Sequence, residues 1–169
     1  MTFLPITTYE NLAPAARAAI DHQLETHGGR LTTTKATLLG HLPSFDAYMQ
    51  WYTLKDELVP FIGERAVTLF AFAISRAAGS AVSVAFFTEI LVAAGEDLDD
   101  PDDIPVTEAE ALLMRWGTLI ATAPHEVDDE LIASLEEAFS EKLRLILVAF
   151  AGFTVATNVF NSVGRVPLA

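Results

Sequence analysis

Apolar residues recur at helical spacing through most of the chain, most densely between Gly63 and Gly95. This stretch predicts two helical segments joined at Ala78-Gly79-Ser80, because each repeats apolar residues every three or four positions. The repeating positions are Val67, Phe70, Ile74 and Ala78 in the first segment and Val82, Phe86, Ile90 and Ala93 in the second. Gly79 can adopt a left-handed conformation there, and Ser80 is expected to cap the second segment by accepting a backbone N–H.

Further helices are predicted on both sides of this central pair. Those before it cover residues 14–27, 31–39 and 44–58, and those after it cover residues 107–123, 130–139 and 140–163. Pro60 is expected to end the helix that precedes the pair. Start signals for the later helices are Thr107 with Glu110, Asp128 or Asp129, and Ser140. No stretch alternates with a period of two, so the predicted fold class is all-α, with seven or eight helices and no strand.

Composition narrows the class of protein. A chain of 169 residues suits a single domain, and its 51% hydrophobic content supplies a large core together with apolar surface for an oligomer. The net charge of −13 argues against partners such as nucleic acid or an anionic membrane surface, which select basic faces. Because the chain has no cysteine, disulfides, thiolate metal sites and thiol catalysis are excluded.

Two segments bear on the compartment and on the assembly. The first ten residues lack the basic and apolar regions of a signal peptide, so we expect a cytoplasmic protein. Residues 145–163 carry no charge and approach the length of a membrane span, but polar residues crowd their second half. We therefore expect a buried helix at the centre of an oligomer. Asn158 and Asn161 share a face of this helix and need polar partners, either in a subunit interface, which we favour, or from a ligand.

An acidic stretch separates the two halves of the chain. Residues 96–110 hold eight acidic side chains and no basic one, which is typical of a solvated loop. Asp97, Asp99 and Asp103 only loosely approach the spacing of a calcium loop, and no glycine lies among them. We expect no metal site and no cofactor.

The central pair resembles the core of the AhpD-like alkylhydroperoxidase and carboxymuconolactone decarboxylase family. In that family a small-residue turn precedes a helix that opens with Cys-x-x-Cys, a His follows one turn later, and a Glu lies about one helix earlier. Here these positions fall at Ser80, Ser83, Phe87 and about Thr68. Two further segments are similar to family patterns, Leu38-Leu39-Gly40-His41-Leu42-Pro43 and Phe160-Asn161-Ser162-Val163-Gly164. The resemblance covers residues 31–169 and leaves residues 1–30 as an N-terminal helical extension.

The resemblance implies a fold and a chemistry that this chain cannot fully perform. The thiol relay of the peroxidases needs a thiolate, a resolving cysteine and proton carriers, and none of the four side chains is present. Ser80 is then a helix cap and Ser83 a small packing residue. The decarboxylase branch needs no cysteine pair, and its candidate groups here are His41 and Glu64, with Arg65 or Arg76 to hold an anion.

Aromatic residues define the candidate pocket. Trp51 and Tyr52 belong to an aromatic stripe, a pattern that occurs more often in a core than at a cofactor. Any residual pocket is expected to be lined by Trp51, Tyr52, Phe70, Ser83, Phe86 and Phe87 and to suit a small apolar molecule. We therefore predict a homo-oligomer (a trimer, dimer or hexamer) that has lost thiol peroxidase activity. A decarboxylase-type enzyme is the alternative, and a structural or partner-binding helical module is the third hypothesis.

Overall fold

The computed structural model describes residues 2–98 and 104–168, and these residues form helices without a strand. The α-helices are α1 (Pro14–His27), α2 (Thr33–Leu38), α3 (Leu42–Ala77), α4 (Ala81–Ala93), α5 (Glu108–Thr122), α6 (Asp129–Ala138) and α7 (Glu141–Val163). Two 3-10 turns, Tyr9–Asn11 and Pro124–Glu126, precede α1 and α6. For the described part of the chain, the predicted all-α fold is confirmed.

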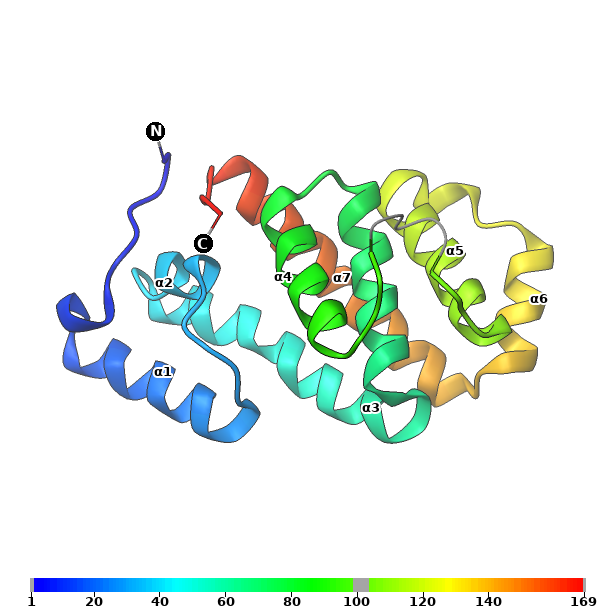
Figure 1. Cartoon of the computed structure of the whole chain (residues 1–169), viewed down its shortest axis with the longest axis horizontal. Helices are drawn as coiled ribbons and strands as arrows, with labels where there is room; N and C mark the ends of the chain where they lie inside the picture. The colour runs from blue at the N-terminus through cyan, green and yellow to red at the C-terminus, as the bar shows by residue number, and fades with distance from the viewer. Residues whose placement is uncertain (1, 99–103, 169) are drawn as a thin grey trace.

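The longest helix, α3, packs against α1, α2, α4, α5 and α7. In Figure 1, α1 and α2 lie at one end of the molecule and α5 and α6 at the other, with α4 and α7 between them. The second half of α3 is the apolar segment that the sequence marks as central, and its residues from Ala66 to Ser75 are all buried. Their side chains join those of α4, α5, α6 and α7 in the main core.

The prediction that Pro60 ends a helix is wrong. Helix α3 continues through Pro60 and departs from helical geometry only at Gly63, where φ is 82° and ψ is 156°. Proline removes one backbone donor, and here helical geometry continues for two more residues, Phe61 and Ile62. The change of direction occurs at Gly63 because a residue without a Cβ adopts this positive-φ conformation at little cost.

Most of the predicted helix ends are confirmed, but the cap at Ser80 is not. Thr107 and Glu110 form a complete capping box, and Asp128 and Ser140 accept backbone N–H bonds at the starts of α6 and α7. Gly79 adopts the left-handed conformation expected of it, with φ of 67°. Ser80 is the residue before α4, yet its hydroxyl makes no capping bond and donates instead to the Ser83 hydroxyl oxygen at 3.1 Å.

A second, smaller core joins the N-terminal helix to the rest of the molecule. Its buried residues come from the segments around α1, α2 and the start of α3: Leu12, Ala16, Ile20, Leu38, Leu39 and Phe45. The two cores flank the first half of α3 and hold α2 over it. This placement of α2 matters for the site, because α2 is too short to be stable alone.

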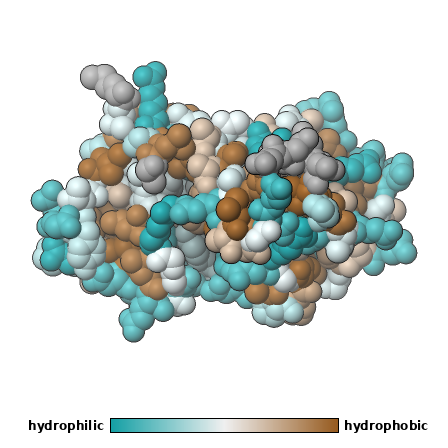
Figure 2. All heavy atoms as spheres, viewed as in Figure 1, coloured by the Kyte–Doolittle hydropathy of each residue, from teal (hydrophilic) through white to brown (hydrophobic). Residues whose placement is uncertain are grey.

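Apolar side chains also remain on the surface. Apolar patches alternate with hydrophilic residues on the face shown in Figure 2. On α7, Leu145, Val148, Val159 and Val163 are between 55% and 69% exposed. Both α3 and α7 are long and apolar enough to cross a bilayer by length and composition, a test that core helices of soluble proteins also pass.

Candidate ligand-binding site

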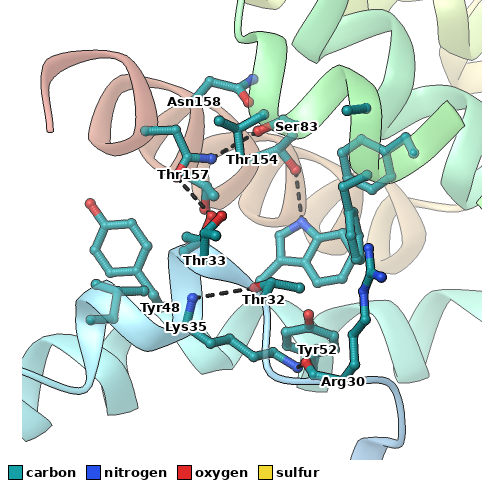
Figure 3. Close-up of a pocket in the computed structure, with 18 of the residues that line it drawn as sticks. Arg30, Thr32, Thr33, Lys35, Tyr48, Tyr52, Ser83, Thr154, Thr157 and Asn158 are labelled. Atoms are coloured by element: carbon teal, nitrogen blue, oxygen red, sulfur yellow. Dashed lines mark hydrogen bonds between the residues drawn. The ribbon is translucent and has the colours of Figure 1, made fainter. Parts of the chain in front are cut away.

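A cavity of about 460 Å³ lies between α2, the first half of α3, α4 and α7. Its wall is completed by Arg30 from the α1–α2 connection and by Leu168 near the C-terminus. The volume lies within the range of pockets that hold small molecules in proteins. Figure 3 shows side chains from the four helices converging on it.

Aromatic rings form one wall of this cavity. The ring centroids of Trp51 and Tyr52 lie 4.9 Å apart, and those of Trp51 and Phe87 lie 6.0 Å apart. Phe86 packs edge-on against Phe87 with centroids 5.1 Å apart. These four aromatic residues and Ser83 line the cavity, as the sequence predicts. Phe70 does not, because it stacks in the main core, 5.7 Å from the Trp116 ring.

Ser83 lies in a chain of hydrogen bonds that links three helices. The Thr34 hydroxyl donates to Asn161 Oδ1 at 2.8 Å, and Asn161 Nδ2 donates to Ser83 Oγ at 3.1 Å. Ser80 also donates to Ser83 Oγ. The network joins α2, α7 and α4 and fixes the Ser83 hydroxyl at the cavity wall. The sequence indicates a small packing residue at Ser83, but its hydroxyl is bonded on two sides.

Both asparagines of α7 are hydrogen-bonded within the chain, although one donor of Asn158 has no partner. Asn158 is 2% exposed, and its Oδ1 accepts a bond from the Ser75 hydroxyl at 3.2 Å. Its Nδ2 is buried without a hydrogen-bond partner, although the residue lines the cavity. Because Asn158 and Asn161 both face the interior, the expectation that a subunit interface satisfies them is wrong. Asn158 Nδ2 is an unused donor at the cavity wall.

Lys35 is the most deeply buried charged residue of the site, and it is among the lining residues that sequence reasoning missed. It lies on α2, is 2% exposed and lines the cavity. Its ammonium donates to the Arg30 carbonyl at 3.2 Å and lies 4.5 Å from the centroid of the Tyr52 ring. No salt bridge joins it to a carboxylate among the described residues. A lysine in a threonine-rich segment is typical of a solvated helix start, so no local signal indicates that it is buried.

The surroundings of Lys35 are of low polarity, and they shift the pKa values of Lys35 and Tyr52. Burial lowers the pKa of Lys35 from 10.5 to about 8, because the charged form loses its water. Burial also raises the pKa of Tyr52 to about 12, so that phenol stays neutral at physiological pH. At the edge of the cavity, Arg30 and Glu89 pair with each other and are both more than half exposed. Lys35 is therefore the one unpaired formal charge among the described lining residues.

The candidate groups for decarboxylation do not come together. His41 precedes the first turn of α3, and its Nδ1 lies 2.8 Å from the Ser44 hydroxyl. Glu64 lies beyond the Gly63 break and pairs with Lys55 at 2.6 Å. The intervening helix separates the two by roughly 30 Å at about 1.5 Å per residue. Neither residue lines the cavity.

The remaining predicted residues also lie outside the cavity. Arg65 binds Glu96 and Glu110, each at 2.6 Å, and donates to the Pro105 carbonyl, so its charge is already neutralised. Thr68 donates to the Glu64 carbonyl within α3. Arg76, near the end of α3, has its guanidinium 5.7 Å from the centroid of the Phe72 ring. Of the positions that match the family relay, Ser83 and Phe87 face the cavity.

The described side chains do not assemble a metal-binding site. Among residues 2–98 and 104–168, no group of three or more His, Cys, Asp or Glu side chains is placed to hold a metal ion. Asp99 and Asp103 of the acidic stretch lie outside the described residues.

No protein-family model matches the sequence, and no curated protein matches it significantly.

The arrangement suits binding better than catalysis. Ser83 Oγ accepts bonds from Ser80 and Asn161, neither of which can act as a general base, and none of the described lining residues is a histidine. Glu89, the only carboxylate among the described wall residues, is paired with Arg30. What remains is an aromatic wall with a few fixed polar groups, which is the usual composition of a small-molecule pocket.

Proposed function

We propose that this protein binds a small, mainly apolar molecule in the cavity between α2, α3, α4 and α7. The observation that carries the proposal is the cavity itself, whose volume of about 460 Å³ is bounded by Trp51, Tyr52, Phe86 and Phe87. Burying an apolar ligand against these rings is favourable by about 25 cal/mol for each Å² removed from water. The polar groups at the wall give such a ligand its orientation.

We also propose a family origin for this chain. The chain is an AhpD-like, carboxymuconolactone decarboxylase-type protein that has lost thiol peroxidase chemistry. In support, α4 begins at Ala81 directly after the Gly79 turn, and Ser80 and Ser83 lie 3.1 Å apart at the position expected for the cysteine pair. Without sulfur, the same corner of the fold serves as a wall of the ligand cavity.

The same proposal includes a homo-oligomer assembled through α7. The exposed face of this helix carries Leu145, Val148, Val159 and Val163, and residues 145–163 include no charge although the chain as a whole carries −13. A second copy of the chain suits such a face, because an uncharged surface avoids the repulsion between two acidic molecules. Gly152, exposed near the middle of the helix with open space beside it, would allow a close helix–helix approach.

A mutation that blocks the cavity tests the binding function. Ala85 is exposed and lines the cavity, so Ala85→Trp adds a bulky ring there without disturbing the core. Ala81 is an exposed alanine of the same helix outside the cavity, and Ala81→Trp is the matched control. Binding of a panel of small apolar and amphipathic compounds would be measured by ligand-observed NMR and by thermal shift.

We expect the wild type and Ala81→Trp to bind the same compounds and Ala85→Trp to bind them at least tenfold more weakly. Two results would refute the proposal. One is that no compound of the panel binds the wild type. The other is that Ala85→Trp binds as tightly as Ala81→Trp, which would place binding elsewhere on the protein.

A further inference from the structure

Two side chains that line the cavity, Lys35 and Asn158, keep hydrogen-bond donors without a partner. The Lys35 ammonium has three N–H groups and uses one, on the Arg30 carbonyl. Asn158 Nδ2 is buried and uses none. Resting on the proposed binding function, we infer that the ligand is an apolar monocarboxylate whose carboxylate pairs with Lys35. A carboxylate is an acceptor only, so it complements a wall that offers donors.

The main argument that the ligand is an anion is that Lys35 is a buried cation without a counter-ion among the described residues. Removing an ammonium from water is unfavourable unless a partner compensates the charge. The Arg30 carbonyl and the Tyr52 ring compensate the Lys35 charge only in part, since neither carries a formal charge. A ligand carboxylate would supply the missing charge and accept the two remaining N–H groups. The free protein thus holds a binding group in an unfavourable state that the ligand relieves.

The other charged groups around Lys35 do not replace a ligand anion. On α4, Glu89 is paired with Arg30, and that pair is exposed at the edge of the cavity. On α1, His27 packs on the Tyr52 ring at 5.8 Å and its Nδ1 lies 2.6 Å from Asp56. Helix α7 contributes only uncharged side chains to the cavity. Lys35 is therefore the group that selects the charge of the ligand.

The two polar regions of the cavity set the direction of the ligand. Figure 3 shows the Lys35 side chain running toward Tyr52 and Arg30 at one end, whereas Asn158 and Ser83 lie at the other. The aromatic wall lies between these ends. A carboxylate at Lys35 thus directs the apolar body along Trp51 toward α4 and α7.

Lys35 is better suited to ion pairing than to forming an imine with a carbonyl compound. With a pKa of about 8, most of the side chain is protonated at neutral pH. The position over the face of Tyr52 also favours the charged form. The described lining residues include no histidine and no unpaired carboxylate to dehydrate a carbinolamine.

Matched acids and amides separate recognition of charge from recognition of shape. The probes are decanoate with decanamide, 4-phenylbutyrate with 4-phenylbutyramide, and 1-naphthylacetate with 1-naphthylacetamide. Dissociation constants would be measured at pH 7 for the wild type, Lys35→Met, Lys35→Arg, Arg30→Gln and Lys142→Met. Lys142 is an exposed lysine outside the cavity, so Lys142→Met controls for loss of a positive charge.

We expect the wild type to bind at least one acid tenfold or more tightly than its amide, and Lys35→Met to bind the two equally. Lys142→Met should retain the full preference, and Lys35→Arg part of it. The preference should shrink as pH rises above 8, where free Lys35 loses its proton. If the wild type binds acid and amide alike, or if Arg30→Gln rather than Lys35→Met removes the preference, the inference is overturned while the apolar pocket stands. If no probe binds, the proposed function fails with it.

Discussion

Replacing Lys35 with methionine should stabilise the ligand-free protein. The drop in the pKa of Lys35 from 10.5 to about 8 measures how strongly the fold disfavours its charge. At about 1.4 kcal/mol for each pKa unit, this amounts to about 3 kcal/mol. Methionine has a similar shape without the charge, but it loses the bond to the Arg30 carbonyl, worth about 1 kcal/mol. The net gain is about 2 kcal/mol, or about 4–8 °C in Tm for a chain of this size.

The pH dependence provides the sharper test, and its sign follows from linkage. Between pH 8 and 10.5 the unfolded chain holds more protons at Lys35 than the folded chain does, so stability rises with pH in this window. The penalty is complete below pH 8 and absent above 10.5. The advantage of Lys35→Met over the wild type should therefore be largest at pH 7 and should reverse by about pH 10.5, where only the lost hydrogen bond remains.

Urea unfolding at several pH values would measure this difference, with Lys142→Met as the control. Lys142 is exposed, so its replacement should change stability by no more than about 0.5 kcal/mol at any of these pH values. The reasoning is refuted if the wild type is the more stable protein at pH 7, or if the difference from Lys35→Met does not change between pH 7 and 10.5. Together with the ligand experiment, a more stable variant that no longer prefers acids would identify Lys35 as a binding group that lowers the stability of the fold.

Three further predictions concern other parts of the molecule. Arg65→Met should destabilise the fold by about 2 kcal/mol at pH 7, because the buried Glu110 carboxylate loses its cationic partner. Burial raises the pKa of Glu110, but the bonds from Arg65 and Thr107 outweigh it and lower that pKa, so the deficit measured by urea unfolding should narrow as pH falls below 4.5. The double substitution Ser80→Cys and Ser83→Cys should form a disulfide in air, because the two hydroxyl oxygens lie 3.1 Å apart. Mass spectrometry should show a mass loss of about 2 Da that dithiothreitol reverses, whereas two free thiols after prolonged air oxidation would contradict this geometry. Val159→Asp should dissociate the proposed oligomer in light scattering without unfolding the chain, since the side chain is 56% exposed; an unchanged mass would exclude α7 as the interface.

Much of the local structure could be predicted from the sequence, because helix ends depend on neighbouring residues. The capping box at Thr107 and Glu110, the caps at Asp128 and Ser140, and the left-handed Gly79 all follow from short-range hydrogen bonding and backbone sterics. The absence of alternating apolar positions likewise predicted the all-α class, confirmed for the described residues. Helical periodicity also marked the aromatic side chains that form the cavity wall.

Tertiary structure decided which of several local outcomes occurs. A proline can end a helix or be carried within it, and in α3 the helix continues through Pro60 and breaks at Gly63. A serine before a helix can cap it or bond elsewhere, and at Ser80 the neighbouring Ser83 hydroxyl takes the bond. Phe70 has the same spacing as the pocket aromatics but faces Trp116 because α5 packs on its side of α3.

The binding chemistry itself depends on the tertiary structure. Lys35 is polar by sequence, yet it is buried because the smaller core holds α2 over α3 and the Lys35 side chain reaches Tyr52. Asn158 is likewise buried by α3, with its amide nitrogen left unpaired at the cavity. Sequence determines which groups a helix presents and at what spacing. Whether a group meets water, a partner or an empty cavity depends on which helices pack around it, and burial is what makes Lys35 a candidate anion-binding residue.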